Sequence, residues 1–160
     1  MADASRAGTS ETSVAPGRDD DFVLPFRTEE SRLMGRVIRL GGVVDTILKR
    51  HDNPEPVSIV LGEALALAGL LGASLKPDSR LTLQTRGDGP IGFLVVNLEK
   101  PADTTGARVR GYASLDAERW SSATAGSARP AQGALLGTGH LALTIDPGGN
   151  RESYQGIVTI

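Results

Sequence analysis

The feature that most constrains the fold is a long apolar segment that starts at Glu55 or Pro56 and runs to about Lys76. Prolines suit the first turn of a helix, and Pro77 marks where the helix must end. Its leucines are spread around the whole helical circumference: Leu61, Leu65, Leu67, Leu70, Leu71 and Leu75. A helix that is apolar all round has to be covered on nearly all sides. We therefore expect a buried central helix.

A membrane-spanning helix is the alternative interpretation of this segment. Val57 to Leu75 approaches the roughly 20 residues that are needed to cross a bilayer. Glu63 lies near the middle and opposes insertion, and the glycines of the segment add little to it. We favour a soluble buried helix and expect no membrane partner, with a membrane-inserted module as the competing hypothesis.

Most of the remaining chain shows strand patterns. They occur at 22–26, 32–42, 80–86, 91–98, 107–114, 140–146 and 153–160. A short amphipathic helix fits 43–48, and 116–139 is typical of a long loop with one helical turn before Leu135. Together these elements predict an α+β fold, with mainly antiparallel sheets packed around the buried apolar helix.

The two ends of the chain differ from its middle. The first 20 residues are small, polar and acidic, and we expect a disordered tail because they cannot bury enough apolar surface to offset the entropy of ordering. Residues 21–160 are long enough for one domain with a core of its own. The last strand pattern reaches Ile160 without a turn or cap, so we expect a domain that is truncated at its C-terminus.

Charge and cysteine content exclude several classes of function. The formal net charge is −2, and the acidic excess lies in the first 21 residues. The neutral remainder has no basic stripe, which argues against a nucleic-acid partner. The chain contains no cysteine, so it can form no disulfide, thiolate metal site or catalytic thiol. No secretory signal is recognisable, and we expect a cytoplasmic location.

Catalytic constellations are also lacking. His51 and His140 are the only histidines, and neither stands in a metal-ligand spacing. The glycine-rich stretches 87–89 and 137–139 lack the Lys-Ser/Thr of a phosphate loop and indicate hairpin turns. Asp146 precedes Pro-Gly-Gly, which is ordinary turn chemistry. We expect no catalytic residues, no metal site and no enzyme; a small-molecule hydrolase or transferase that uses His140 and Asp146 is the alternative.

Several segments, taken in order, resemble the heat-shock protein 33 family of redox-regulated molecular chaperones. The resemblance covers about residues 21–160, and the apolar helix is its most specific part. The similar segments are FVLPF at 22–26, GRVIRLG at 35–41, LGEALALAGLLG at 61–72, QTRGDGP at 84–90, RGYA at 110–113, LLGTGHL at 135–141, TID at 144–146 and YQGIV at 154–158.

The resemblance implies that residues 21–160 are the core domain of an ATP-independent holdase, which captures unfolded client proteins under oxidative or heat stress. In the family, a C-terminal cysteine motif holds zinc, and oxidation of that motif exposes the client surface. This chain has no cysteine, so we expect no cofactor here and zinc only in the absent C-terminal segment of the family. A homodimer of the full-length form is compatible with the resemblance.

For the client-binding surface we predict apolar strand residues that face away from the buried helix: Leu94, Val96, Leu98 and Tyr112. The reason is that 91–98 is apolar on both strand faces, and two apolar faces need two covers. The alternative is that both faces are internal in a layered fold.

Overall fold

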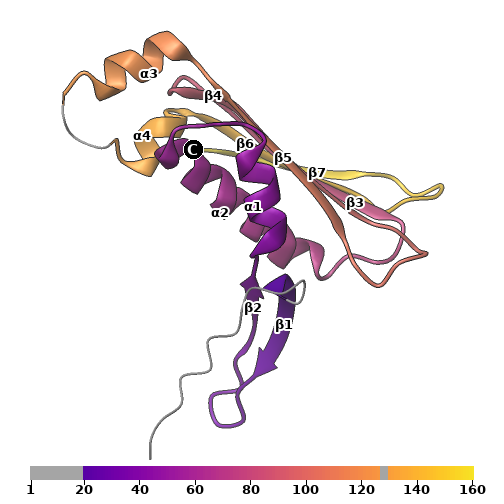
Figure 1. Cartoon of the computed structure of the whole chain (residues 1–160). Helices are drawn as coiled ribbons and strands as arrows, with labels where there is room; N and C mark the ends of the chain where they lie inside the picture. The colour runs from indigo at the N-terminus through magenta and orange to yellow at the C-terminus, as the bar shows by residue number, and fades with distance from the viewer. Residues whose placement is uncertain (1–19, 127–129) are drawn as a thin grey trace, which may run out of the picture.

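The computed structural model describes residues 20–126 and 130–160 (Figure 1). The tail predicted at residues 1–20 lies outside this part of the chain, apart from Asp20. The side chain of Asp20 pairs with Arg39, with 3.2 Å between the carboxylate and the guanidinium. The described part therefore begins one residue before the domain that the sequence predicts.

The main element is a five-stranded antiparallel sheet with the order β5-β4-β3-β6-β7. Its strands are β3 (Ser79–Gly87), β4 (Ile91–Lys100), β5 (Arg108–Leu115), β6 (Gly139–Asp146) and β7 (Tyr154–Thr159). Alternation of apolar and polar residues along β3 leaves Leu81 and Leu83 buried and Arg80 and Arg86 exposed, as a half-covered strand requires. The predicted α+β fold with antiparallel sheets is confirmed.

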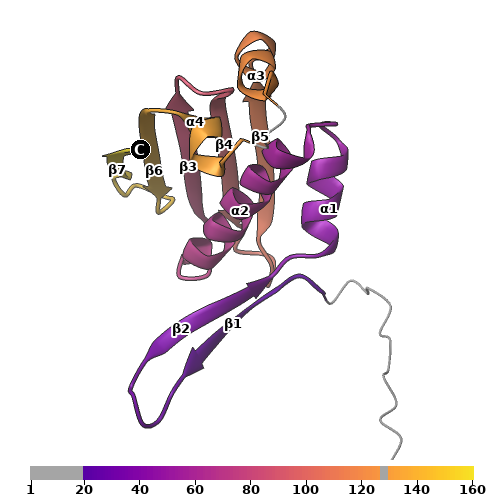
Figure 2. The same cartoon turned by 90° about the vertical axis from the view of Figure 1, so that its left-hand side faces the viewer.

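The apolar segment forms α2 (Glu55–Gly72), which lies across β3, β4 and β5 (Figure 2). The side chains that it buries belong to one helix face: Val57, Val60, Leu61, Leu65 and Ala68. The prediction that α2 is covered on nearly all sides is wrong, because the sheet covers one face only and leaves Leu67 and Leu71 exposed. By length and composition alone α2 could span a bilayer, but its buried face forms the core of the domain.

The N-terminal part forms a second, smaller sheet. β1 (Phe22–Arg27) and β2 (Met34–Arg39) pair in antiparallel fashion as a hairpin, and α1 (Gly42–Lys49) follows directly. The hairpin extends away from the rest of the domain, and its base lies near one end of α2 (Figure 1, Figure 2). α1 packs beside α2 and against β5.

The segment 116–139, which we predicted to be a loop, contains two helices. α3 (Ala117–Thr124) starts at Asp116, whose Oδ1 accepts hydrogen bonds from the backbone N–H groups of Glu118 and Arg119. α4 (Gln132–Leu136) includes the helical turn that the sequence indicated before Leu135. α3 escaped prediction because its Ser- and Ala-rich sequence carries almost no apolar stripe, and its main signal is the capping aspartate.

The two glycine-rich stretches, 87–89 and 137–139, lie side by side, and their backbones are in direct contact. Residues 87–89 form the turn between β3 and β4, as predicted, whereas 137–139 connect α4 to β6 and are not a hairpin turn. The carboxylate of Asp88 accepts a hydrogen bond of 2.7 Å from the N–H of Thr138. A Cβ on Gly89 would stand 2.5 Å from the carbonyl oxygen of Leu135. Glycine is needed here for close backbone packing.

Candidate functional site

Three of the four residues predicted to bind clients are core residues. Leu94, Val96 and Leu98 are at most 3% exposed and belong to the hydrophobic core under α2. A Cβ on Gly72 of α2 would stand 2.6 Å from Leu98 Cδ2, so helix and strand are in close contact there. The prediction that these three side chains face away from the helix is therefore wrong. β4 is apolar on both faces, but its even-numbered residues form the covered face.

Tyr112 does face away from α2, as predicted. It stands opposite Val95 on the other face of the sheet, and 46% of it is exposed. Because β5 is at the edge of the sheet, the ring reaches His51 at the end of α1, with 5.4 Å between the ring centroids in an edge-on arrangement. The prediction from the sequence that Tyr112 binds clients is untested, and the exposed apolar residues of the β1–β2 hairpin are the stronger candidates.

His140 and Asp146 do not come together. Both lie on β6, where His140 stands opposite Arg86 and Asp146 opposite Arg80. They are six residue steps apart along the extended strand, which is about 20 Å. Oδ1 of Asp146 accepts a hydrogen bond of 3.0 Å from the N–H of Gly148, as in a turn. Within residues 20–126 and 130–160, no group of three His, Asp or Glu side chains is placed to hold a metal ion.

Five large exposed apolar side chains lie on the β1–β2 hairpin, and three more lie on β7: Tyr154, Ile157 and Val158. We call the five on the hairpin the hairpin surface, and each is between 48% and 80% exposed: Leu24, Phe26, Leu33, Met34 and Val37. Leu24 stands opposite Val37, and Phe26 opposite Gly35, so Leu24, Phe26 and Val37 share one face of the two-stranded sheet. Met34 stands opposite Arg27 and lies on the other face. A Cβ on Gly35 would stand 2.4 Å from Cζ of Phe26. The missing side chain at Gly35 lets the Phe26 ring lie across the partner strand.

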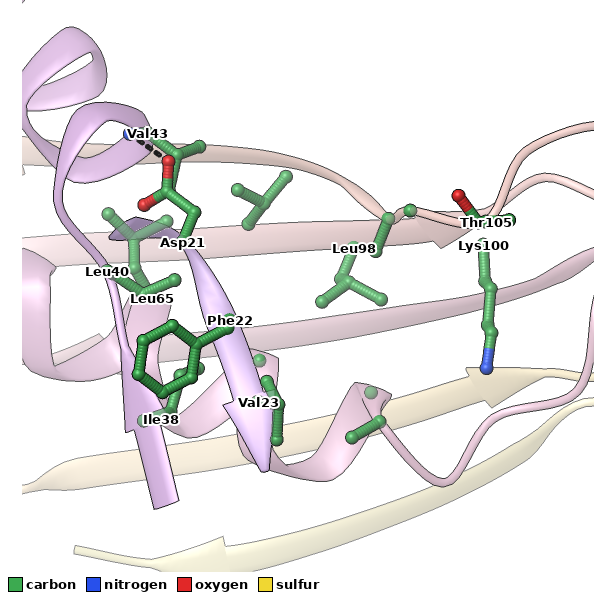
Figure 3. Close-up of a pocket in the computed structure, with 16 residues that line it drawn as sticks. Asp21, Phe22, Val23, Ile38, Leu40, Val43, Leu65, Leu98, Lys100 and Thr105 are labelled. Atoms are coloured by element: carbon green, nitrogen blue, oxygen red, sulfur yellow. Dashed lines mark hydrogen bonds between the residues drawn. The ribbon is translucent and has the colours of Figure 1, made fainter. Parts of the chain in front are cut away.

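A cleft of about 490 Å³ lies between the base of the hairpin and α2 (Figure 3). Phe22, Val23 and Ile38 enter it from the hairpin, and Leu98 enters it from β4 (Figure 3). On α2, small residues leave the space open, and Ile38 packs directly onto Gly69. Val23 and Ile38 stand opposite each other on the hairpin face away from Leu24 and Val37, so the cleft is a second apolar area at the base of the hairpin.

Asp21 fixes the base of the hairpin to α1. Its Oδ1 accepts a hydrogen bond of 2.7 Å from the N–H of Gly41. Its Oδ2 accepts one of 3.0 Å from the N–H of Val43 (Figure 3). The residue that precedes the helix is a glycine and supplies no side-chain cap. The carboxylate of the residue just before β1 thus satisfies two free donors at the N-terminus of α1, where negative charge is favoured.

The hairpin also offers free backbone groups. Within the part of the chain that the structure describes, β1 and β2 pair only with each other. Each strand therefore has an outer edge that can pair with another extended chain, and Pro25 removes a donor from one of these edges. Apolar side chains beside an open strand edge are suited to non-covalent capture of extended polypeptide. The sequence did predict the two apolar strands of the hairpin. It did not show that they would form a separate two-stranded sheet, which cannot cover its own apolar side chains.

Comparison with known proteins gives a consistent result. A family model described as Hsp33 protein matches residues 21–160. The 33 kDa chaperonin of Caulobacter vibrioides is 44% identical over 151 residues, which cover 93% of this chain and 48% of the relative. The 33 kDa chaperonin of Pseudomonas fluorescens is 38% identical over 142 residues, which cover 89% and 43%. The chain therefore spans a little less than half the length of these curated relatives.

One solved structure has a similar fold. The crystal structure of the 33 kDa chaperonin of Thermotoga maritima, also described as a heat shock protein 33 homolog, superposes with a TM-score of 0.66 at 22% sequence identity. The superposition covers 87% of this chain and 45% of that chain. At this identity the likeness concerns the fold alone.

Proposed function

The chain belongs to the Hsp33 family, and from this premise we propose that it is an ATP-independent holdase: a chaperone that binds unfolded proteins and keeps them from aggregating without catalysing a reaction. The chaperonin names of its relatives support a chaperone. The holdase mechanism, in which binding alone protects the client, is our proposal for this chain.

The observation that carries the proposal is the hairpin surface. Its five large apolar side chains are about half exposed or more on an element that projects from the domain. Exposed apolar side chains that gather in one place indicate a binding surface, whereas single ones are ordinary. The apolar cleft at the base of the hairpin adds a second apolar area, on the hairpin face toward α2.

The energetics fit reversible binding of many different sequences. Full burial of one large apolar side chain is worth about 1.5–3 kcal/mol, so a side chain that is already about half covered offers about 1 kcal/mol. Five such contacts hold a client without any single contact being essential. Backbone pairing at the hairpin edges would add affinity that does not depend on the client's side chains.

We further propose that client binding by this chain is independent of thiol chemistry. The sequence has no cysteine, and thiolate sulfur is the group that both binds zinc tightly and senses oxidants. No zinc or other cofactor is proposed for these residues. The proposed partners are unfolded proteins of the cytoplasm, not nucleic acid or membranes.

The proposal is tested by light scattering of a heat-unfolding client. Citrate synthase is heated with and without an equimolar amount of the chain in the absence of ATP, and an equal mass of a folded inert protein serves as the control. We expect the chain to suppress the scattering, because client segments bind the hairpin surface before they associate with one another. Unchanged scattering with a chain that circular dichroism shows to be folded would contradict the holdase proposal.

A further inference from the structure

The β1–β2 hairpin carries a concentration of positive charge that the near-neutral sum of residues 22–160 conceals. Residues 22–39 contain four arginines and two glutamates, an excess of two positive charges. Both glutamates and one arginine lie in the turn between the strands, and Arg39 at the base of the hairpin is paired with Asp20. Arg27 and Arg36 remain. Both are exposed, and neither forms an ion pair among the described residues.

Arg27 and Arg36 are neighbours on one face of the hairpin. Arg27 stands opposite Met34, and Arg36 stands opposite Pro25, so the two arginines are diagonal neighbours across the two strands. Such residues are about 7–8 Å apart, within reach of each other's long side chains. Like charges so placed destabilise a sheet. An anionic group from outside the chain relieves their repulsion.

The hydrogen bonds at the turn show which backbone groups of β2 are free. The N–H of Thr28 donates a hydrogen bond of 2.9 Å to the C=O of Leu33, so these opposite residues form a bonded pair. In an antiparallel ladder, bonded pairs alternate with pairs that make no bond to each other. By this alternation the N–H and C=O groups of Met34 and Arg36 point outward from β2. An outward position of β1 is Pro25, which has no N–H, so β2 offers the better edge for a further strand.

The two faces of the hairpin beside this edge differ in chemistry. Leu24, Phe26 and Val37 make one face apolar, whereas Arg27 and Arg36 make the other face basic. Successive side chains of a strand point to opposite faces. A segment that pairs with β2 therefore presents every second residue to the apolar face and the residues between them to the basic face.

We propose that the hairpin prefers client segments in which apolar and acidic residues alternate. This inference rests on the proposed holdase function and narrows its class of client. The apolar residues of such a segment lie beside Val37 and are covered from water on that side. An acidic residue beside Arg36 forms a charge-assisted pair with the guanidinium. A segment with lysine in the acidic positions brings like charges together, which disfavours its binding.

Fluorescence anisotropy with three labelled peptides tests this preference. The peptides share the same leucine, phenylalanine and valine residues at alternate positions, and glutamate, glutamine or lysine occupies the positions between them. We expect the glutamate peptide to bind about three- to tenfold more tightly than the glutamine peptide, and the lysine peptide to bind most weakly. A peptide of glutamate alone should bind poorly, because it has nothing for the apolar face. Equal binding of the glutamate and lysine peptides overturns the inference, and so does equal binding of the all-glutamate peptide, which would indicate a plain anion site.

Charge variants of the hairpin test where the preference arises. Arg36→Gln should weaken binding of the glutamate peptide about three- to tenfold and leave binding of the glutamine peptide unchanged. Arg36→Glu should reverse the order of the glutamate and lysine peptides. Arg110→Gln is the matched control, because it removes the same charge from an exposed arginine on β5. With all variants folded by circular dichroism, equal effects of Arg36→Gln and Arg110→Gln would assign the preference to net charge and overturn the inference.

Failure of this inference is distinguishable from failure of the holdase proposal. The unmodified chain is measured in parallel in the citrate synthase scattering assay. Suppressed scattering together with equal binding of the three peptides rejects the preference and leaves the holdase proposal standing. Suppressed scattering with no binding of any peptide also rejects it, because clients are then held elsewhere than on the hairpin.

Discussion

The inner face of α2 and the β1–β2 hairpin are built from similar residues and have opposite roles. Leu61, Leu65 and the β4 leucines form a closed core between helix and sheet. Leu24, Phe26 and Val37 are as apolar, but they stand on a two-stranded sheet over which no described element lies on their side. Apolar composition alone therefore does not decide which residues form a binding surface. The presence or absence of a second layer decides whether an apolar residue contributes to stability or is available for binding.

The comparison is tested most strongly by truncating one leucine in each region. Leu94→Ala should lower the free energy of unfolding by about 2–5 kcal/mol, because it leaves a cavity in a packed core. Leu24→Ala should lower it by less than about 1 kcal/mol, because the side chain is half exposed and its loss leaves no cavity. Urea denaturation followed by circular dichroism measures both. Equal losses would show that the hairpin is as closely packed as the core.

The next largest effect on stability is expected from loosening the attachment of the hairpin to the domain. Asp21→Ala should cost about 1–2 kcal/mol of stability, as loss of a helix cap does, and should speed tryptic cleavage at Arg27 and Arg36. Asp45→Ala is the matched control, since Asp45 lies in the first turn of α1 and makes only an exposed ion pair with Lys49. If both variants are cleaved at the same rate, Asp21 does not anchor the hairpin.

A smaller effect concerns polarity within the core. Thr85 is 4% exposed, and its buried hydroxyl has no hydrogen-bond partner among the described residues. Thr85→Val should raise the free energy of unfolding by about 1 kcal/mol, because it removes an unsatisfied buried polar group. Thr82→Val should lower it slightly, since the Thr82 hydroxyl donates to Asn97 at 2.8 Å. Urea denaturation of the two variants should therefore show changes in the free energy of unfolding of opposite sign. A loss of stability in both variants would contradict this prediction.

The smallest expected effect is that of oxidants specific for thiols. Suppression of aggregation should be the same in dithiothreitol and in diamide, because the chain has no thiol on which either reagent could act. A difference between the two conditions, with the client's own response subtracted, would show that client binding here depends on redox chemistry after all.

The sequence allowed the order and type of most elements to be predicted, but not which surfaces are covered. Alternation at Leu81 and Leu83 and the prolines around α2 are local signals, and they led to the right strands and helix. Whether Leu94 faces a helix or solvent depends on which side of the sheet α2 crosses, and no local pattern contains that information. The exposure of Leu67 could not be predicted for the same reason. An apolar helix indicates burial, but its sequence does not show how many of its faces other elements cover.

The most direct test of the central claim compares two aromatic residues that are almost equally exposed. Phe26 on the hairpin surface is 48% exposed and Tyr112 on the far face of the sheet 46%. Phe26→Thr and Tyr112→Thr are measured in the citrate synthase scattering assay, after circular dichroism shows both variants to be folded. We predict that Phe26→Thr clearly weakens suppression of aggregation and that Tyr112→Thr leaves it nearly unchanged. Loss of suppression in Tyr112→Thr alone would place client binding on the other face of the sheet and contradict the account.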